Sequence, residues 1–320
     1  MIQRASKVIL TPAIAIFILI VSVAPALSQQ TLKKKIDSLF MIASSAELKV
    51  RDQVEPAKDS IAAIGVDAVP ILVDKLTTKS ARERLTVIHI LKRIGSPAVP
   101  HLVRSLKNPD GLVVQRVCWS LGEIGDSNAV APLMEVTSHP RWQVRDEALG
   151  ALGDIGSSQG YEAVAMGFAD AVGQVRKAAV VAAGKIADKR AIPELVARLG
   201  DDFYGARLSA VQALLMLDTS VVVAAISDSL VSDNKLIGDL GCFILGEIGT
   251  DAAIELLLGQ TQAGDADRRA HAAVAIIKAD PLDNCGYRKG IIDRETDRLV
   301  LLKINSAIYS ATNVGQEPKE

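Results

Sequence analysis

Apolar residues recur along this chain with a helical period, and the pattern itself repeats at a nearly constant interval. An Ile-Gly pair, or an equivalent pair, closes each repeat, at steps of 30, 30, 31, 31, 31 and 31 residues. These pairs are Ile64-Gly65, Ile94-Gly95, Ile124-Gly125, Ile155-Gly156, Ile186-Ala187, Leu217-Asp218 and Ile248-Gly249. A unit of this length is too small to bury its own apolar face, so it stacks on copies of itself. The pattern therefore predicts an all-α fold, a right-handed α-α superhelix of about eight two-helix repeats.

Each repeat contains two predicted helices. The first opens near a proline, which a first helical turn tolerates because the missing N–H has no partner there. These prolines are Pro70, Pro100, Pro132 and Pro193. The second helix is clearest at Trp142 to Ile155, where apolar residues gather on one side and a Gly follows as the left-handed C-cap. The other side of this helix carries Gln143, Asp146, Glu147 and Asp154.

Glycines also share one register inside the second helices. They are Gly122, Gly153, Gly184 and Gly246. A glycine inside a helix costs up to about 1 kcal/mol. We therefore expect close packing between neighbouring second helices to compensate for that cost.

Residues 1–28 have the anatomy of a secretory signal peptide. Arg4 and Lys7 make a basic start, Val8 to Val23 form an apolar run, and Ala26-Leu27-Ser28 is a small-x-small cleavage site. A membrane anchor is the alternative, but this run of 16 residues is shorter than the ~20 needed to span a bilayer and contains Pro12. We expect a periplasmic or secreted protein without a stable membrane anchor after cleavage.

The remaining chain divides by how well it follows the repeat. Residues 29–65 are expected to form an N-terminal capping repeat, with Pro56 bending or splitting its second helix. Residues 66–280 form the repeat array, 281–310 a C-terminal capping segment and 311–320 a flexible tail.

Composition and charge indicate how the core is built and argue against one class of function, nucleic-acid binding. Aromatic residues are only 3% of the chain while apolar residues are 49%, so the core must be built from Ala, Val, Leu and Ile. Without Arg4 and Lys7 the 36 basic residues become 34, against 37 acidic residues, which leaves a formal net charge of −3. This balance lacks the basic footprint of a nucleic-acid-binding protein.

The cysteines do not predict a disulfide within the array. Cys118 and Cys242 occupy the same register four repeats apart, which places them on the order of 30–40 Å apart, far beyond disulfide range. We expect both to be buried, reduced thiols. The state of Cys285, outside the array, stays open.

The repeats resemble HEAT repeats, in particular the short kind first described in phycobilin lyases. The resemblance rests on the Val144-Arg145 and Val175-Arg176 pairs and on helix ends such as Leu152 to Gly156, and it covers residues 45 to 280. It implies a ladder in which an Asp and an Arg six residues later tie the repeats together, as Asp170 with Arg176 and Asp201 with Arg207 would. The ladder lapses at Thr78, His139 and Gly238, where we expect less regular stacking.

No residue pattern predicts catalysis, a cofactor or a metal site. The four His residues have neither metal-ligand spacing nor the His-Glu pairs with which the HEAT-like deoxyhypusine hydroxylases hold di-iron. A phosphate-binding glycine loop, a Cys-x-x-Cys pair and a Gly-x-Ser-x-Gly motif are also missing. The row of Arg84, Arg145, Arg176 and Arg207 is either an anion-binding stripe or part of the ladder, and the ladder is favoured where an Asp precedes.

The strongest candidates for a binding site lie on one face of the second helices. Trp119 has Arg116 and Glu123 one turn to each side, and His89 lies one repeat away. Trp and Arg are the residue types that dominate binding hot spots. The alternative is that Trp119 packs over the next repeat at the edge of the core, since large rings are often partly buried.

A second candidate is the turn between helices. Trp142 and Tyr204 share a register there, two repeats apart. Such aromatic residues also often pack back on their own repeat, which is the alternative for both.

We therefore expect an exported scaffold or adaptor that binds another protein or peptide through the concave face of the solenoid, a surface that solenoids use for binding. It has no predicted catalytic step. One alternative is a lyase-like enzyme or enzyme subunit that acts on a chromophore-bearing or other modified protein, although the phycobilin lyases work in the cytoplasm. Another is a structural spacer in an envelope complex. The sequence leaves the partner and the oligomeric state open.

Overall fold

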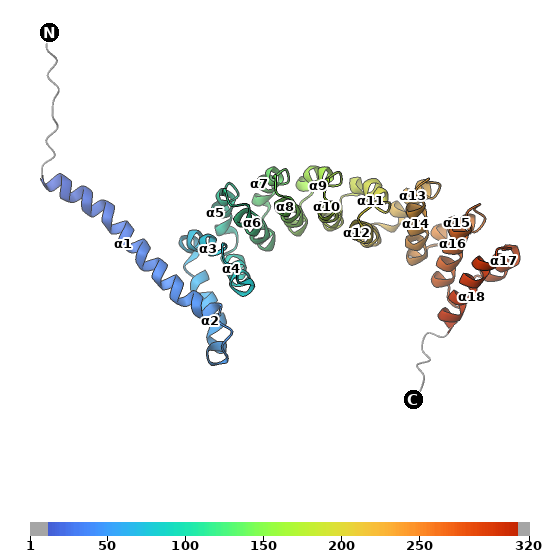
Figure 1. Cartoon of the computed structure of the whole chain (residues 1–320), viewed down its shortest axis with the longest axis horizontal. Coiled ribbons are helices and arrows are strands. Elements are labelled where there is room, and N and C mark those ends of the chain that lie inside the picture. The colour runs from blue at the N-terminus through green and yellow to red at the C-terminus, as the bar shows by residue number, and fades with distance from the viewer. Residues whose placement is uncertain (1–11, 313–320) are drawn as a thin grey trace, which may run out of the picture. The chain divides into compact units, whose positions relative to one another are not determined.

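The structure is a computed structural model that describes the backbone of residues 12–312 and the side chains of residues 28–312. Within that part of the chain every regular element is helical, which confirms the all-α solenoid fold (Figure 1). The basic start of the predicted signal peptide, with Arg4 and Lys7, and residues 313–320 of the predicted tail lie outside the described residues. The chain divides into two compact units, residues 1–107 and 108–320.

The first unit contains five described α-helices. They are α1 (Pro12–Ala43), α2 (Arg51–Ala62), α3 (Val69–Lys75), α4 (Ala81–Ile94) and α5 (Val99–Ser105). Helix α1 packs on α2, α2 on α4, and α3 on both α4 and α5. The C-terminal part of α1 enters the core through Ile36 and Phe40, and Lys75 Nζ donates to Asp37 at 2.5 Å. Helix α2 continues through Pro56, so the predicted splitting of the helix at this proline does not occur.

The second unit consists of stacked helix pairs. Its helices are α6 (Gly111–Ile124), α7 (Val130–Val136), α8 (Trp142–Ile155), α9 (Tyr161–Gly167), α10 (Gly173–Ile186), α11 (Ile192–Arg198), α12 (Tyr204–Leu215), α13 (Thr219–Ser229), α14 (Lys235–Ile248), α15 (Asp251–Gln260), α16 (Ala266–Ala279), α17 (Tyr287–Arg294) and α18 (Arg298–Thr312). Short 3₁₀ helices complete the described elements: η1 (Leu48–Val50), η2 (Gly65–Ala68), η3 (Ser96–Ala98), η4 (Ser127–Ala129), η5 (Ser158–Gly160) and η6 (Lys189–Ala191). Figure 1 shows α7, α9 and α11 along one side of this unit and α8, α10 and α12 along the other.

The predicted helix ends are found where the Ile-Gly pairs stand. Helix α6 ends at Ile124 and Gly125 closes it in the left-handed conformation, with φ +75°. Helix α10 closes in the same way on Ala187, with φ 56°, so that a residue with a Cβ adopts a conformation that favours glycine. The pattern fails at Leu217-Asp218, where α12 already ends at Leu215 and Asp218 instead caps α13 by accepting from the backbone N–H of Ser220.

The register of glycines in the second helices does bring neighbouring helices close together. A Cβ placed on Gly153 would lie 2.7 Å from Ala182 Cα, and one on Gly184 would lie 2.8 Å from Ala213 Cβ. Each of these joints therefore pairs a Gly on one helix with an Ala on the next. The same pairing is made by Gly122 with Ala151 and by Gly246 with Ala275.

The joint between α12 and α14 lacks this pairing of a Gly with an Ala. Continuing the 31-residue step from Gly184 and Ala213 leads to Leu215 and Ile244, so that two branched side chains replace the Gly and the Ala. The small residue that admits a neighbouring helix is missing here. Packing between α12 and α14 is accordingly sparser than between α10 and α12 or between α14 and α16.

Cys118 and Cys242 are buried free thiols, as predicted, while Cys285 is exposed and free. Burial raises the pKa of both buried thiols, that of Cys242 to about 12. Among the helices that the structure describes, none combines the length and the hydropathy needed to cross a bilayer.

Candidate partner-binding face

The exposed side of α6, α8, α10, α12, α14 and α16, here called the second-helix face, carries the candidate site in the second unit. The residues that share the register of Trp119 mark its midline. They are Trp119, Gly150, Val181, Gln212, Phe243 and Val274. Trp119 is half-buried, whereas Gln212 is exposed and the exposed fraction of Phe243 is 38%. Nothing lies within 4 Å of a Cβ placed on Gly150, so the midline is open in front of this glycine.

The structure separates the residues predicted around Trp119. Trp119 and Glu123 are both half-buried on α6, while His89 is exposed on α4 and belongs to the first unit. Arg116 is 7% exposed, so the prediction that it shares an exposed face with Trp119 is wrong. The reason is its position on the helix, because Val113 and Ser120, three residues before it and four after it on the same side of α6, are also buried.

The two aromatic residues predicted in the turns begin separate helices. Trp142 opens α8 and Tyr204 opens α12, and α10 lies between these helices. The exposed fraction of Tyr204 is 66%, so most of this residue is open to solvent. The guanidinium carbon of Arg207 lies 5.4 Å from the centre of that ring.

Around Gly150 the face is acidic. Asp146, Glu147 and Asp154 all lie on α8, and Glu123 lies on α6. Burial raises the pKa of Glu147 to about 7, a hydrogen bond with Gln115 opposes the rise, and the charges of Asp146 and Asp154 add to it. The sequence placed Glu147 on the polar side of α8, but the structure half-buries it.

This raised pKa makes stability depend on pH. An unfolded Glu has a pKa near 4.5, so between pH 4.5 and about 7 the folded state holds a proton that the unfolded state has lost. The free energy of unfolding therefore falls as the pH rises through that window. We expect Glu147→Gln to raise the free energy of unfolding at pH 8 by roughly 1–2 kcal/mol and to have little effect at pH 4. The full pKa shift corresponds to about 3.4 kcal/mol, and solvent screening of the half-buried carboxylate reduces this value.

Urea unfolding of both proteins at the two pH values measures this difference. Glu135→Gln is the control, since Glu135 is exposed on α7 and is not among the charges that shift the pKa of Glu147. A gain for Glu147→Gln that is equal at pH 4 and pH 8 would show that its burial does not perturb its ionisation.

Beyond the acidic zone the face becomes basic and then apolar. Lys177 and Lys185 are exposed on α10. Helix α12 then presents Leu208, which is 45% exposed, and Leu215, which is 36% exposed, and Met216 follows at 76%. Sequence reasoning missed this apolar zone, although the departure of Leu215 from the glycine register was the signal that could have found it.

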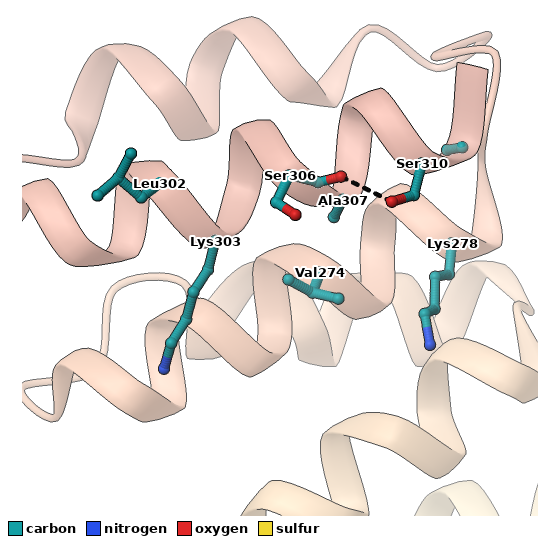
Figure 2. Close-up of a pocket in the computed structure, with 8 residues that line it drawn as sticks. Val274, Lys278, Leu302, Lys303, Ser306, Ala307 and Ser310 are labelled. Carbon is teal, nitrogen blue, oxygen red and sulfur yellow. Dashed lines mark hydrogen bonds between the residues drawn. The ribbon is translucent and has the colours of Figure 1, made fainter. Parts of the chain in front are cut away.

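Two hollows lie at the C-terminal end of the face. One, of about 140 Å³, is lined by Asp239, Phe243, Gly246, Glu247, His271, Val274, Ala275 and Lys278 between α14 and α16. The other, of about 640 Å³, is lined by Val274, Lys278, Leu302, Lys303, Ser306, Ala307, Ser310 and Ala311 between α16 and α18. Figure 2 shows Val274 between Lys278 and Lys303 in this second hollow, whose lining contains no carboxylate. No group of three or more His, Cys, Asp and Glu side chains in the described part of the chain is placed to hold a metal ion.

Arginines link successive repeats behind this face. Arg145 donates to both carboxylate oxygens of Asp170, at 2.7 and 2.8 Å, and Arg176 donates to both of Asp201, at 2.8 Å each. Nη1 of Arg176 also donates at 2.9 Å to the carbonyl of Asp170, six residues earlier. The ladder that the resemblance implied is therefore present, and it occupies the guanidinium groups of Arg145 and Arg176.

The ladder and the Gly-Ala joints agree with the comparison with protein families. Residues 99–180 match the HEAT repeats family. The match includes all of α6 and α8, which carry the acidic zone of the second-helix face. A comparison with curated proteins finds no match.

Solved structures similar to this chain include two named enzymes and an engineered protein. Human deoxyhypusine hydroxylase in complex with glycerol is 18% identical, with a TM-score of 0.35, over 79% of this chain and 98% of its own. The complex of CpcE and CpcF of phycocyanin lyase from a Nostoc species is 18% identical, with a TM-score of 0.38, over 76% and 94%. The engineered protein is 18% identical, with a TM-score of 0.41, over 87% and 88%.

Proposed function

We propose that this protein is an exported scaffold or adaptor that binds another protein or peptide through the second-helix face, with no catalytic step of its own. The observation that carries the proposal is the sequence of acidic, basic and apolar zones along one face of a stacked helical array. Stacked repeats present extended binding surfaces, and a cluster of exposed apolar side chains marks an interaction site.

Each zone suits a different part of a protein partner. Trp119, with Glu123 and the carboxylates of α8, offers an aromatic ring and negative charge to a basic segment. Tyr204 and the exposed leucines of α12 offer apolar area to a hydrophobic segment. His89 and Trp142 remain predicted contacts of the same kind.

Export is part of the proposal and rests on the sequence of residues 1–28, with its basic start, short apolar run and small-x-small site. Cleavage after Ser28 would begin the mature protein at Gln29, with the buried part of α1, from Ile36 onward, still in place. The partner would then be a protein of the periplasm or of the external medium.

Site-specific photo-crosslinking in the source cell tests the proposal. A photoreactive phenylalanine analogue at Gly150, Val181 or Gln212 reports on the second-helix face, and the same residue at Met166, which is 73% exposed on α9, is the control. We expect adducts with one partner from the face positions and none from position 166. Mass spectrometry of the adduct identifies the partner and the N-terminus of the crosslinked protein.

Two results would count against the proposal. Adducts from Met166 alone would move binding to the first helices, and a crosslinked protein that retains residues 1–28 in the cytoplasm would refute export. Trp119→Ala is expected to weaken binding of the identified partner at least tenfold, as truncation of an aromatic hot spot does.

A further inference from the structure

At the sparse joint between α12 and α14, large side chains of α12 stay exposed. On α6 and α10, the positions that face the next helix carry glycines at the start and near the end, such as Gly173 and Gly184 on α10. The same positions on α12 carry Tyr204 and Leu215. Large side chains therefore line α12 where the other joints need small ones, and they remain exposed.

These side chains form one continuous apolar stripe. Tyr204, Leu208 and Leu215 are spaced by four and seven residues, which aligns them on one side of a helix. Their span along the axis is about 16 Å, or three helical turns. Met216 follows the end of α12, and Phe243 is exposed on the neighbouring α14 in the register of Gln212. Tyr204, Leu208, Leu215, Met216 and Phe243 are here called the α12 surface.

The α12 surface has a basic edge and an acidic edge. On the α10 side, Lys177 lies against the start of α12, since its Cδ is 3.3 Å from a Cβ placed on Gly205. On the α14 side, Glu247 is exposed one turn after Phe243, and beyond it the ammonium of Lys278 lies 5.6 Å from the centre of the Phe243 ring. Helix α12 itself carries a single charged residue, Arg207, which is half-buried.

We infer that the α12 surface is the docking site for an amphipathic helix of the partner protein. That helix carries an apolar stripe of three to four turns, carboxylates along the edge that meets Lys177, and basic side chains along the edge that meets Glu247. Helices bind apolar faces in this way through residues at i, i+4 and i+7. This inference rests on the proposed function, because the α12 surface is part of the second-helix face.

The charges argue against two other occupants. An anionic membrane surface would favour basic residues alone around the apolar stripe, whereas here the exposed carboxylate of Glu247 also borders it. If a second copy of this chain bound here, its helix α18, with exposed leucines, would be the element that docks on the α12 surface. The charged residues of α18 are Arg298 and Lys303. That helix has no carboxylate to meet Lys177.

A labelled synthetic helix tests the inference directly. The probe is a fluorescein-labelled peptide with leucines at i, i+4, i+7 and i+11, glutamates along one edge and lysines along the other. Its binding to the full chain is followed by fluorescence anisotropy. A peptide of the same composition with the leucines spread round the helix is the control and should bind at least tenfold more weakly.

Variants of the chain locate the binding site. Leu208→Asp should weaken binding of the probe at least tenfold, and Met216→Gln is a second variant on an exposed side chain that folding does not require. Leu299→Asp, on the 69% exposed Leu299 of α18, is the matched control and should leave binding unchanged. Circular dichroism confirms that each variant is folded.

A charge exchange tests the edges. Lys177→Glu should weaken binding of the probe about three- to tenfold, and a probe whose glutamate edge is replaced by lysine should recover that loss. Equal binding of the two probes to both proteins would overturn the predicted edges.

The remaining outcomes separate this inference from the proposed function. If Leu208→Asp and Met216→Gln leave binding unchanged, or if the control peptide binds equally well, the docking site is wrong even when the photo-crosslinks from Gly150 persist. If sedimentation shows that the chain self-associates and Leu208→Asp abolishes this, the occupant is a second copy and the inference is overturned. If no face position gives an adduct, the proposed function itself fails.

Discussion

Replacing Arg176 with alanine is expected to lower the free energy of unfolding by roughly 2–4 kcal/mol. The carboxylate of Asp201, whose side chain is 1% exposed, would lose both hydrogen bonds from the guanidinium of Arg176 and keep only the longer contact with Arg198, at 3.2 Å, as an ion pair. Removing one partner of a buried ion pair is costly because the other charge is then poorly compensated. Urea unfolding followed by circular dichroism measures the loss.

The pH dependence of this loss identifies its cause. Burial alone would raise the pKa of Asp201, but hydrogen bonds from Arg176 and from the backbone N–H of Phe203 outweigh burial and lower the pKa to about 2. The stabilisation is therefore present above the unfolded pKa of 3.8 and is lost as the pH falls towards 2. The difference between wild type and variant should shrink over the same range.

Arg207→Ala is the matched control for the ladder. The position 25 residues after Arg207 is Ser232, where Arg145 and Arg176 have an Asp, and Arg207 donates to the carbonyl of Asp201 at 2.6 Å. Its loss should cost about 1 kcal/mol, the value of an ordinary hydrogen bond. Equal losses for Arg176→Ala and Arg207→Ala would mean that the cross-repeat ion pair adds no stability.

Two glycines on the same helix should respond to alanine in opposite directions. In Gly153→Ala the new Cβ would lie 2.7 Å from Ala182 Cα, so α8 and α10 would have to move apart, and we expect a loss of about 1–3 kcal/mol. In Gly150→Ala the new Cβ meets nothing within 4 Å, and the better helix propensity of alanine should add up to about 1 kcal/mol. Thermal and urea unfolding of the two variants measure both effects.

The contrast between these variants tests the joint itself. Both substitutions make the same chemical change three residues apart on α8, so that helix propensity contributes equally to each. A Gly153→Ala protein as stable as Gly150→Ala would show that close approach of the second helices is not required for stacking.

Much of the fold could be predicted because the same local sequence signals recur in each repeat. The Ile-Gly pairs correctly located the ends of α4, α6, α8 and α14, and the equivalent Ile186-Ala187 pair located that of α10. A cap with positive φ has a strong local preference for glycine. The register of glycines inside the second helices correctly predicted close packing for a different reason. A glycine has no side chain, so it leaves room for the alanine of the facing helix. These signals need only neighbouring residues or one repeat step to be recognised.

The candidate site was harder to predict because exposure is a property of the assembled stack. Arg116 has the polarity of a surface residue, yet it is buried on α6, and Glu147 is half-buried although it belongs to the polar side of α8. The α12 surface was not recognised at all. Its origin is a pair of residues, Leu215 and Ile244, that are ordinary helix residues until the two helices are placed side by side.

The sequence by itself determined the helices, their ends and the repeat step, because backbone preferences and apolar spacing act within one or two turns. It also carried the pattern that residues 99–180 share with HEAT repeats. The tertiary structure alone decided which polar groups are buried, which carboxylates the arginines reach, and where two neighbouring helices pack sparsely. Those outcomes depend on distances between repeats, and such distances follow from how each side chain fits against the next helix.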